Sequence, residues 1–194
     1  MTQVSLAVLV ASARSGNLVS FPTDTVPALA VRPDKSDLIF QAKQRQQDKP
    51  LILMGGLADD LWPFCQGTPE ELEIWRGVAD KHWPGALTLV LPASEKVDRA
   101  VNPHDPTTIG LRVPNCTIAR LILTQTGPLA TTSANLSGQP PLETMAEIEA
   151  QFPDVLTLLP GELNSINTAT GMPSTVAKWT EGGWQILRQG AIKL

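Results

Sequence analysis

Proline ends many of the short apolar runs in this chain, and this feature constrains the fold more than any other. The chain holds 17 prolines in 194 residues, well above the usual share of about 5%. Pro22, Pro92 and Pro114 each follow an apolar run. Because proline fixes φ and has no N–H to donate, it belongs at strand ends and turns and breaks long helices. The sequence therefore predicts many short elements and argues against a helical bundle or coiled coil.

Strand-like runs alternate with helical segments, which is typical of an α/β fold. The clearest helix start is at Thr68, where a capping hydroxyl precedes Pro69 and Glu71 is placed to close a capping box. We expect a first helix that includes Val4 and ends before Gly16. Further helices are expected near residues 36–46, 68–82, 117–125 and 145–152, and strands near 18–21, 51–54, 86–91, 108–113, 128–132, 155–159, 174–179 and 184–188.

Length and composition fit one domain spanning residues 1–194. At roughly 150 residues per domain the chain is slightly more than one domain long, and it shows no internal repeat or long linker. Apolar residues make up 42% and charged residues 18%, which is typical of a folded protein and not of a disordered one. The net charge of -4 argues against a polycation that binds nucleic acid through its overall charge. Any anion site must therefore be a local cluster.

Cysteine and histidine usage indicates a reducing, cytoplasmic compartment and no metal site on the chain. Cys65 and Cys116 are too few for a disulfide framework, and His82 and His104 stand in no metal-ligand spacing. We expect both histidines at surface or structural positions. No run approaches the ~20 apolar residues of a membrane span. No Lys or Arg precedes the apolar residues 6–10, so we interpret them as part of a buried helix and not as a leader.

Three polar segments follow strand-like or helical runs, where ligand sites tend to form. Residues 22–25 carry two hydroxyls and a carboxylate, residues 43–50 carry three cations, and residues 131–138 carry hydroxyl and amide groups that can wrap an anion. A plain turn would also explain the first and third segments. A solvated helix C-terminus would also explain the second. The residues alone leave both interpretations open.

Two arginines stand inside apolar, strand-like runs. These are Arg112 in residues 109–114 and Arg188 in residues 186–188. A guanidinium in such a run needs an anionic partner. That partner could be a structural carboxylate, a bound phosphate or a substrate carboxylate.

Several common site types are absent from the sequence. It contains no GxxxxGK[ST] phosphate loop, no GxGxxG after a strand and no GxSxG around Ser133. Neither histidine has a neighbour that supports a Ser/His/Asp triad, which argues against a covalent hydrolytic intermediate. Trp62, Trp75 and Trp83 are expected to pack in the core. The lack of Tyr and the presence of only 4 Phe weaken the case for an RNA-stacking module.

Seven short motifs, taken in order, resemble the YrdC/TsaC family of threonylcarbamoyl-AMP synthases. They cover almost the whole chain, and their order and spacing make the resemblance specific. The motifs are Pro22-Thr23-Asp24-Thr25, Lys43-x-Arg45 with Lys49-Pro50-Leu51, Trp83-Pro84-Gly85 with Thr88-Leu89, Thr108 to Pro114, Ser133-Ala134-Asn135-x-Ser137-Gly138, Ser174-Thr175-Val176, and Ile186-Leu187-Arg188-x-Gly190.

The resemblance implies a short, single-domain YrdC-like protein with a twisted open mixed sheet and flanking helices around a concave cavity. It implies a nucleotidyltransferase that joins L-threonine, bicarbonate and ATP into threonylcarbamoyl-AMP and releases pyrophosphate. Downstream proteins would then transfer the threonylcarbamoyl group to a tRNA adenosine beside the anticodon. In such a reaction, positioning and charge neutralisation should matter more than covalent catalysis.

The resemblance also implies roles for individual residues. The catalytic set is Lys43, Arg45, Ser133 and Asn135. The ATP-binding set is Arg45, Lys49, Thr108, Thr131, Ser133 and Arg188, with backbone near Thr131 assisting. The threonine-binding set is Thr23, Arg112 and Ser174, with Arg112 as the fork for the substrate carboxylate. We expect Mg²⁺ to shield the phosphates, although no carboxylate cage for it is visible.

Met54 and the segment 26–30 depart from the family pattern. Residues 26–30 replace an aromatic and glycines, and Met54 occupies a slot where many relatives carry a histidine near threonine. These departures bear on the choice of amino acid more than on nucleotide binding.

Two other functions stay open. One alternative is a non-catalytic module that binds tRNA or structured RNA in the same basic cavity. The other is a carbamoyl-adenylate former of the hydrogenase-maturation type, which uses carbamoyl phosphate.

The resemblance leads to a prediction about Lys43 and Arg45. Replacing either residue with alanine should abolish adenylate formation and leave the fold intact, because the reaction depends on cations placed around the phosphates. Pyrophosphate release by each folded variant measures this effect. Near-normal turnover in either variant would contradict the assignment.

Overall fold

The computed structural model describes residues 2–44, 49–163 and 169–194. Its centre is an eight-stranded sheet in the order β10-β9-β5-β6-β4-β7-β3-β2. The pairs β4–β6 and β5–β9 are parallel and the other pairs are antiparallel, so the sheet is mixed. The strands are β2 (Val19–Phe21), β3 (Ala28–Val31), β4 (Ile52–Met54), β5 (Leu87–Pro92), β6 (Thr108–Arg112), β7 (Leu129–Ser133), β9 (Thr175–Thr180) and β10 (Gly183–Arg188).

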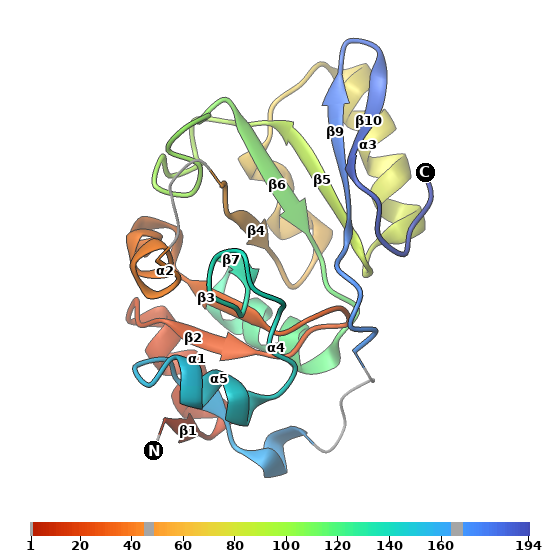
Figure 1. Cartoon of the computed structure of the whole chain (residues 1–194). Helices are drawn as coiled ribbons and strands as arrows, with labels where there is room; N and C mark the ends of the chain where they lie inside the picture. Colours follow the sequence, from red (N-terminus) through yellow and green to blue (C-terminus); the bar gives the residue numbers. More distant parts are fainter. Residues whose placement is uncertain (1, 45–48, 164–168) are drawn as a thin grey trace.

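In the described part of the chain, five α-helices and several short elements surround this sheet. Figure 1 shows α3 beside β9 and β10 at one end of the sheet, and α1, α4 and α5 near β2 and β3 at the other. This arrangement confirms the predicted α/β class with flanking helices. The helices are α1 (Leu6–Arg14), α2 (Asp37–Ala42), α3 (Pro69–His82), α4 (Thr117–Thr126) and α5 (Met145–Gln151). The short elements are the parallel pair β1 (Gln3–Val4) and β8 (Thr157–Leu158), and the 3₁₀ turns η1 (Pro33–Lys35), η2 (Ala58–Asp60), η3 (Trp62–Phe64) and η4 (Pro160–Leu163).

One face of the sheet is buried in the main hydrophobic core. A row of directly paired residues crosses five strands on this face, and each of them is fully buried. Residues of α2 and α3 belong to the same apolar cluster, so these helices cover the row. The row consists of Ala177, Leu89, Leu111, Leu53 and Ala130.

The opposite face is covered at one end only. α1 and α4 form a second apolar cluster with residues of β2, β3 and β7. The neighbouring row of paired residues, displaced by one position along each strand, points to this face because side chains alternate along a strand. Its members line a cavity. They are Lys178, Val90, Gly110, Ile52 and Thr131.

The capping box predicted at the start of α3 is present. The Glu71 backbone N–H donates to the Thr68 hydroxyl at 3.3 Å, and the Thr68 N–H donates to the Glu71 carboxylate at 2.9 Å. The second oxygen of that carboxylate accepts from the indole N–H of Trp179 at 2.8 Å. The cap therefore also joins α3 to β9.

The predicted elements near the N-terminus and around residue 30 differ from the structure. Val4 lies in β1, which pairs with β8, and the first helix starts after the cap residue Ser5. β3 was not predicted because all four of its residues are apolar and buried, so they show no alternation.

The helix predicted from Ser36 is shorter than expected. It ends at Ala42, and Gln44 has a left-handed φ of 49°, which stops the helix. The Ser36 hydroxyl does not cap this helix, because it donates to the Pro33 carbonyl at 2.7 Å. Residues 45 and 46 of the predicted span lie outside the described residues.

The capping box gives a prediction about stability. Thr68→Ala removes the hydroxyl that accepts the Glu71 N–H, so it should lower the free energy of unfolding by about 1 kcal/mol. Urea denaturation measures the loss. Glu73→Ala on the exposed side of the same helix is the control, with an expected change under about 0.5 kcal/mol. Equal losses in both variants would contradict a role for the cap.

Candidate functional site

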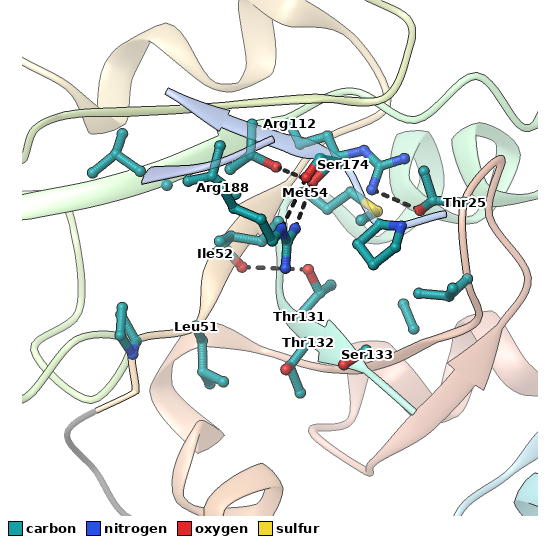
Figure 2. A pocket seen from close by; sticks show the side chains of 18 of the residues that line it. Thr25, Leu51, Ile52, Met54, Arg112, Thr131, Thr132, Ser133, Ser174 and Arg188 are labelled. Carbon is teal, nitrogen blue, oxygen red and sulfur yellow. Dashed lines mark hydrogen bonds between the residues drawn. The ribbon is translucent and has the colours of Figure 1, made fainter. Parts of the chain in front are cut away.

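A cavity of about 630 Å³ lies on the open face of the sheet. Its walls come from β3 to β7, from β9 and β10, and from the loops that follow β2, β7 and β5. Figure 2 shows side chains from these elements converging on it. Eight predicted site residues line the cavity, namely Thr23, Thr108, Arg112, Thr131, Ser133, Asn135, Ser174 and Arg188.

The floor of the cavity depends on a glycine. Gly110 pairs with Val90 on one side and with Ile52 on the other. A Cβ on Gly110 would lie 2.6 Å from Cγ2 of Ile52, which is a severe clash. A side chain here would also project into the cavity. Gly110 was predicted only as part of the motif from Thr108 to Pro114, although a glycine inside a strand is itself a signal of close approach.

Arg112 is buried at one end of the cavity and makes three hydrogen bonds within the chain. Its Nη2 donates to the Asp24 carboxylate at 2.6 Å, its Nη1 to the Thr25 hydroxyl at 2.9 Å, and its Nε to the Gly85 carbonyl at 3.1 Å. The Arg112 and Asp24 side chains are only 5% and 14% exposed. Burial lowers the pKa of Arg112, and the charge of Asp24 opposes that shift. Arg112 therefore has a structural carboxylate partner and also faces the cavity.

The turn at residues 22–25 is closed by its own hydroxyl groups. The Thr23 hydroxyl donates to the Val26 carbonyl at 2.7 Å and accepts the Thr25 backbone N–H at 3.1 Å. The two threonine hydroxyls also lie 3.1 Å apart. Thr23 closes the turn and also lines the cavity, and its contact with a ligand stays a prediction.

Ser174 and Arg188 meet beside Thr88. Arg188 donates from Nε to the Ser174 carbonyl at 3.0 Å and from Nη2 to the Ser174 hydroxyl at 3.1 Å (Figure 2). That hydroxyl lies 2.9 Å from the Thr88 hydroxyl. Partial burial lowers the pKa of Arg188. A glycine permits this contact, because a Cβ on Gly190 would lie 2.3 Å from the Pro173 carbonyl oxygen.

Lys43 is fully buried behind the loop that follows β7. Its ammonium donates to the Ser133 carbonyl and, at 3.0 Å, to the Asn135 side-chain oxygen. The Ser133 hydroxyl donates to the same Asn135 oxygen at 2.6 Å. The structure thus brings Lys43, Ser133 and Asn135 together, with Ser133 and Asn135 on the cavity wall. Because Lys43 is buried, we now expect Lys43→Ala to disturb this loop as well as activity.

The predicted cations that follow Lys43 are only partly described. Lys49 is exposed and lies beside Pro50, which lines the cavity, but Lys49 itself is not among the described lining residues. Arg45 lies outside the described residues. Their predicted roles in nucleotide binding stay predictions.

A wall formed by residues 102–105 was not predicted as part of the site. Asn102, His104 and Asp105 line the cavity there, and Lys178 lines it from β9. His104 is exposed, as expected, but it also faces the site. A hydrogen bond from the Thr107 hydroxyl lowers the pKa of Asp105, so this carboxyl group is ionised at neutral pH. These residues could not be predicted to line the site, because a polar loop has the same composition whether or not it borders a cavity.

Over the described ranges, no group of three or more His, Cys, Asp or Glu side chains could hold a metal ion. Cys65 and Cys116 are buried free thiols. Burial raises the pKa of Cys65 to about 11, so its thiol stays protonated at neutral pH. No helix in the described part of the chain is long and apolar enough to span a membrane.

Comparisons with known proteins show the family to which the chain belongs. The Sua5/YciO/YrdC family model, described as "Telomere recombination", matches residues 11–190. A threonylcarbamoyl-AMP synthase of Pyrococcus abyssi is 36% identical over 185 residues, covering 93% of this chain and 52% of that protein. One from Vibrio parahaemolyticus is 35% identical over 184 residues, covering 91% and 94%. The chain therefore spans about half the length of the Pyrococcus relative and nearly all of the Vibrio one.

Solved structures of Sua5 and YciO have the same fold as this chain. Pyrococcus abyssi Sua5 complexed with L-threonine superimposes with a TM-score of 0.84 and 32% identity, over 96% of this chain and 54% of that one. Escherichia coli YciO superimposes with a TM-score of 0.79 over 97% of this chain and 90% of that one. The sequence identity to YciO is 22%, so this second similarity concerns the fold alone.

The buried ion pair gives a prediction about stability. Asp24→Asn removes the counter-charge of a buried guanidinium, so it should lower the free energy of unfolding by about 3 kcal/mol or more. Asp34→Asn is the matched control, because Asp34 pairs with Arg32 at 2.7 Å in a pair whose side chains are 43% and 42% exposed. It should cost under about 1 kcal/mol. Urea denaturation compares the two, and equal losses would contradict the structural role of Asp24.

Proposed function

Because the chain belongs to the Sua5/YciO/YrdC family, we propose that it is an enzyme that makes threonylcarbamoyl-AMP from L-threonine, bicarbonate and ATP. It would act as a nucleotidyltransferase that transfers AMP and releases pyrophosphate. The observation that carries this proposal is one cavity lined by the buried guanidinium of Arg112, by the more exposed guanidinium of Arg188 and by many hydroxyl groups. Such a cavity can hold a carboxylate and a polyphosphate together.

The end of the cavity at Arg112 suits the amino acid. A guanidinium offers five N–H donors, and the contacts to Asp24, Thr25 and Gly85 use one donor each from Nη2, Nη1 and Nε. The second N–H of each terminal nitrogen remains for a substrate carboxylate. Thr23 and Ser174 line the same part of the cavity. The Sua5 structure in complex with L-threonine supports this assignment by similarity.

Other residues that line the cavity suit the nucleotide. Thr108, Thr131, Ser133 and Arg188 line it, and by similarity they would contact ATP together with Arg45 and Lys49. We expect Mg²⁺ to be held mainly by the phosphates, because this ion commonly uses one or two carboxylates and keeps several waters. Asp105 fits that need, because it is ionised and lies on the wall, whereas Asp24 is paired with Arg112.

The chemistry needs positioned charges and no covalent intermediate on the chain. The ammonium group of threonine first loses a proton, and the resulting amine then adds to bicarbonate with loss of water, which gives an N-carboxylate. An oxygen of that carboxylate then bonds to the α-phosphorus of ATP, and the bond from this phosphorus to the bridging oxygen breaks as pyrophosphate leaves. Negative charge grows on the phosphate oxygens, so fixed cations and N–H or O–H donors lower the barrier.

Lys43 would act on this step through its neighbours. Its ammonium holds the Ser133 carbonyl and the Asn135 side chain, and Asn135 in turn donates to the carbonyls of Leu136 and Gln139 at 2.8 and 2.7 Å. These bonds fix the loop that presents the Ser133 hydroxyl to the cavity. We therefore assign Lys43 a positioning role and leave direct contact with the reacting groups to Ser133, Asn135 and Arg45.

The product is a reactive mixed anhydride, so a transfer protein must consume it. By similarity, that transfer places the threonylcarbamoyl group on a tRNA adenosine next to the anticodon, which belongs in the cytoplasm. The RNA-binding alternative predicts salt-sensitive binding of tRNA without threonine-dependent turnover of ATP. The assay below separates the two functions.

We expect pyrophosphate release from ATP to require both L-threonine and bicarbonate, with threonylcarbamoyl-AMP identified by mass. Arg112→Lys keeps the charge but loses the planar fork, so it should raise KM for threonine at least tenfold and leave KM for ATP nearly unchanged. Arg14→Lys, on the exposed side of α1, is the control and should change neither. Release that does not depend on threonine would overturn the proposal.

A further inference from the structure

We propose that Lys178 binds the pyrophosphate part of ATP, that is, the two phosphates that leave in the reaction. Lys178 belongs to none of the motifs that carry the family resemblance, and it was not predicted as a site residue. Its ammonium holds the leaving group and neutralises the charge that this group gains. This inference rests on the proposed function, because it concerns the leaving group of that reaction.

Lys178 lies on the cavity face of β9. In the register of the sheet it pairs with Val90 of β5 and with Gln185 of β10, and Val90 in turn pairs with Gly110 of β6. Lys178, Val90 and Gly110 all line the cavity. Because Gly110 has no side chain, this row leaves room over the floor for a ligand beside the lysine.

The ammonium of Lys178 is not used inside the described part of the chain. No described residue accepts a hydrogen bond from it or forms an ion pair with it. The two arginines that line the cavity differ in this respect. Arg112 is paired with Asp24. Arg188 donates twice to Ser174. An ammonium has three N–H donors, and all three of those on Lys178 can therefore serve an anionic ligand.

A wall of fixed polar groups lies at the same end of the sheet. β5 and β9 run parallel, so the loop after β5 lies at the end toward which β9 runs (Figure 1). In this loop the Asp105 carboxylate accepts from the hydroxyls of Thr107 and Thr108, the second at 3.1 Å, and Asn102 donates to the Thr108 carbonyl at 3.2 Å. These bonds hold the carboxylate on its own wall, apart from Lys178.

The charges of Lys178 and Asp105 nevertheless act on each other. The hydrogen bond from the Thr107 hydroxyl is the main cause that lowers the pKa of Asp105, and the positive charge of Lys178 adds to the same effect. The two side chains therefore attract each other across the cavity without forming an ion pair. A ligand with phosphate oxygens for the lysine fits between them.

The chemistry of the step places the leaving group away from the amino acid. An oxygen of the N-carboxylate bonds to the α-phosphorus while the bond from this phosphorus to the bridging oxygen breaks. The electron pair of the broken bond goes to the bridging oxygen of pyrophosphate. The attacking and leaving oxygens lie roughly in line on opposite sides of the phosphorus. With the amino acid at Arg112, the pyrophosphate therefore lies toward the other end of the cavity.

Lys178 lies toward that other end. Arg112 is the last residue of β6 and donates to Gly85, just before β5 begins. Ser174, at the same end, comes just before β9. Lys178 is four positions beyond Ser174, which is about 13 Å along an extended strand. The cavity thus runs from the start of β5 and β9, where the amino acid is assigned, toward the half of β9 that carries Lys178.

A lysine that merely covers apolar surface is the other explanation for this position. Lysine can lay its methylene stem on apolar groups and keep its ammonium in water. Val90 and Val176 line the cavity on either side and offer such a surface. The two explanations differ in the effect of removing the charge, because only a contact with phosphate makes the charge matter for binding.

The test compares Lys178→Met with the unmodified chain by isothermal titration calorimetry, with ATP, AMP and pyrophosphate as ligands and Mg²⁺ present throughout. Methionine keeps a long apolar stem and removes the charge. Kd should rise about tenfold or more for ATP and pyrophosphate, because a charge-assisted hydrogen bond is lost. Kd for AMP should stay within about twofold, because AMP lacks the two leaving phosphates. If pyrophosphate alone binds too weakly to measure, the comparison of ATP with AMP decides.

Two control variants accompany the test. Lys178→Arg keeps the charge and should leave every Kd within about threefold. Lys81→Met removes an exposed lysine from α3, which covers the opposite face of the sheet, and should leave every Kd within about twofold. Circular dichroism checks that the variants fold, and Lys178→Gln serves the same comparison if Lys178→Met does not.

Kinetics separate a contact with the leaving group from a general structural role. Lys178→Met should lower kcat/KM for ATP about tenfold or more and leave KM for L-threonine within about twofold. An unchanged Kd for ATP, or equal losses for ATP and AMP, overturns the inference. The proposed function then still stands if the unmodified chain makes threonylcarbamoyl-AMP. A folded, unmodified chain that releases no pyrophosphate in response to threonine overturns both.

Discussion

The buried guanidinium of Arg112 joins three segments that lie far apart in the sequence. From β6 it donates to Asp24 and Thr25 in one turn and to the carbonyl of Gly85 before β5. Taking a cation out of water costs several kcal/mol unless an opposite charge and good hydrogen bonds replace its hydration. Asp24, at 2.6 Å, supplies that charge. The turn, the strand and the loop therefore keep one arrangement, and this arrangement fixes one end of the cavity.

The same principle recurs at the other polar groups of the site. Lys43 is buried and donates to Ser133 and Asn135, and Arg188 donates twice to Ser174. A buried polar group is costly when it lacks a partner, so each of these bonds also holds a backbone segment in place. The cavity wall is thus held in place by hydrogen bonds to neighbouring side chains, including the buried Lys43 behind it. This suits a reaction that depends on fixed charges.

The sheet explains how a single chain builds both a core and a site. Adjacent rows of paired residues point to opposite faces, so Leu111 is buried under α2 and α3 while Gly110 forms the floor of the cavity. α1 and α4 cover only one end of the cavity face. An uncovered sheet face would normally be polar. Here it carries hydroxyls and cations next to Met54 and Ile52, a mixture that suits a ligand with both charged and apolar parts.

The α/β class and most element positions could be predicted from the sequence, because periodicity and capping residues are local properties. The eight residues of the cavity wall were predicted from the resemblance of seven motifs to a known family. Tertiary structure decided what those patterns leave open. Asp24 proved to be the partner of Arg112, Lys43 lies behind the wall, and residues 102–105 join it. Burial and pairing depend on which distant segments come into contact. Strand register determines these contacts, and it cannot be predicted from local sequence patterns.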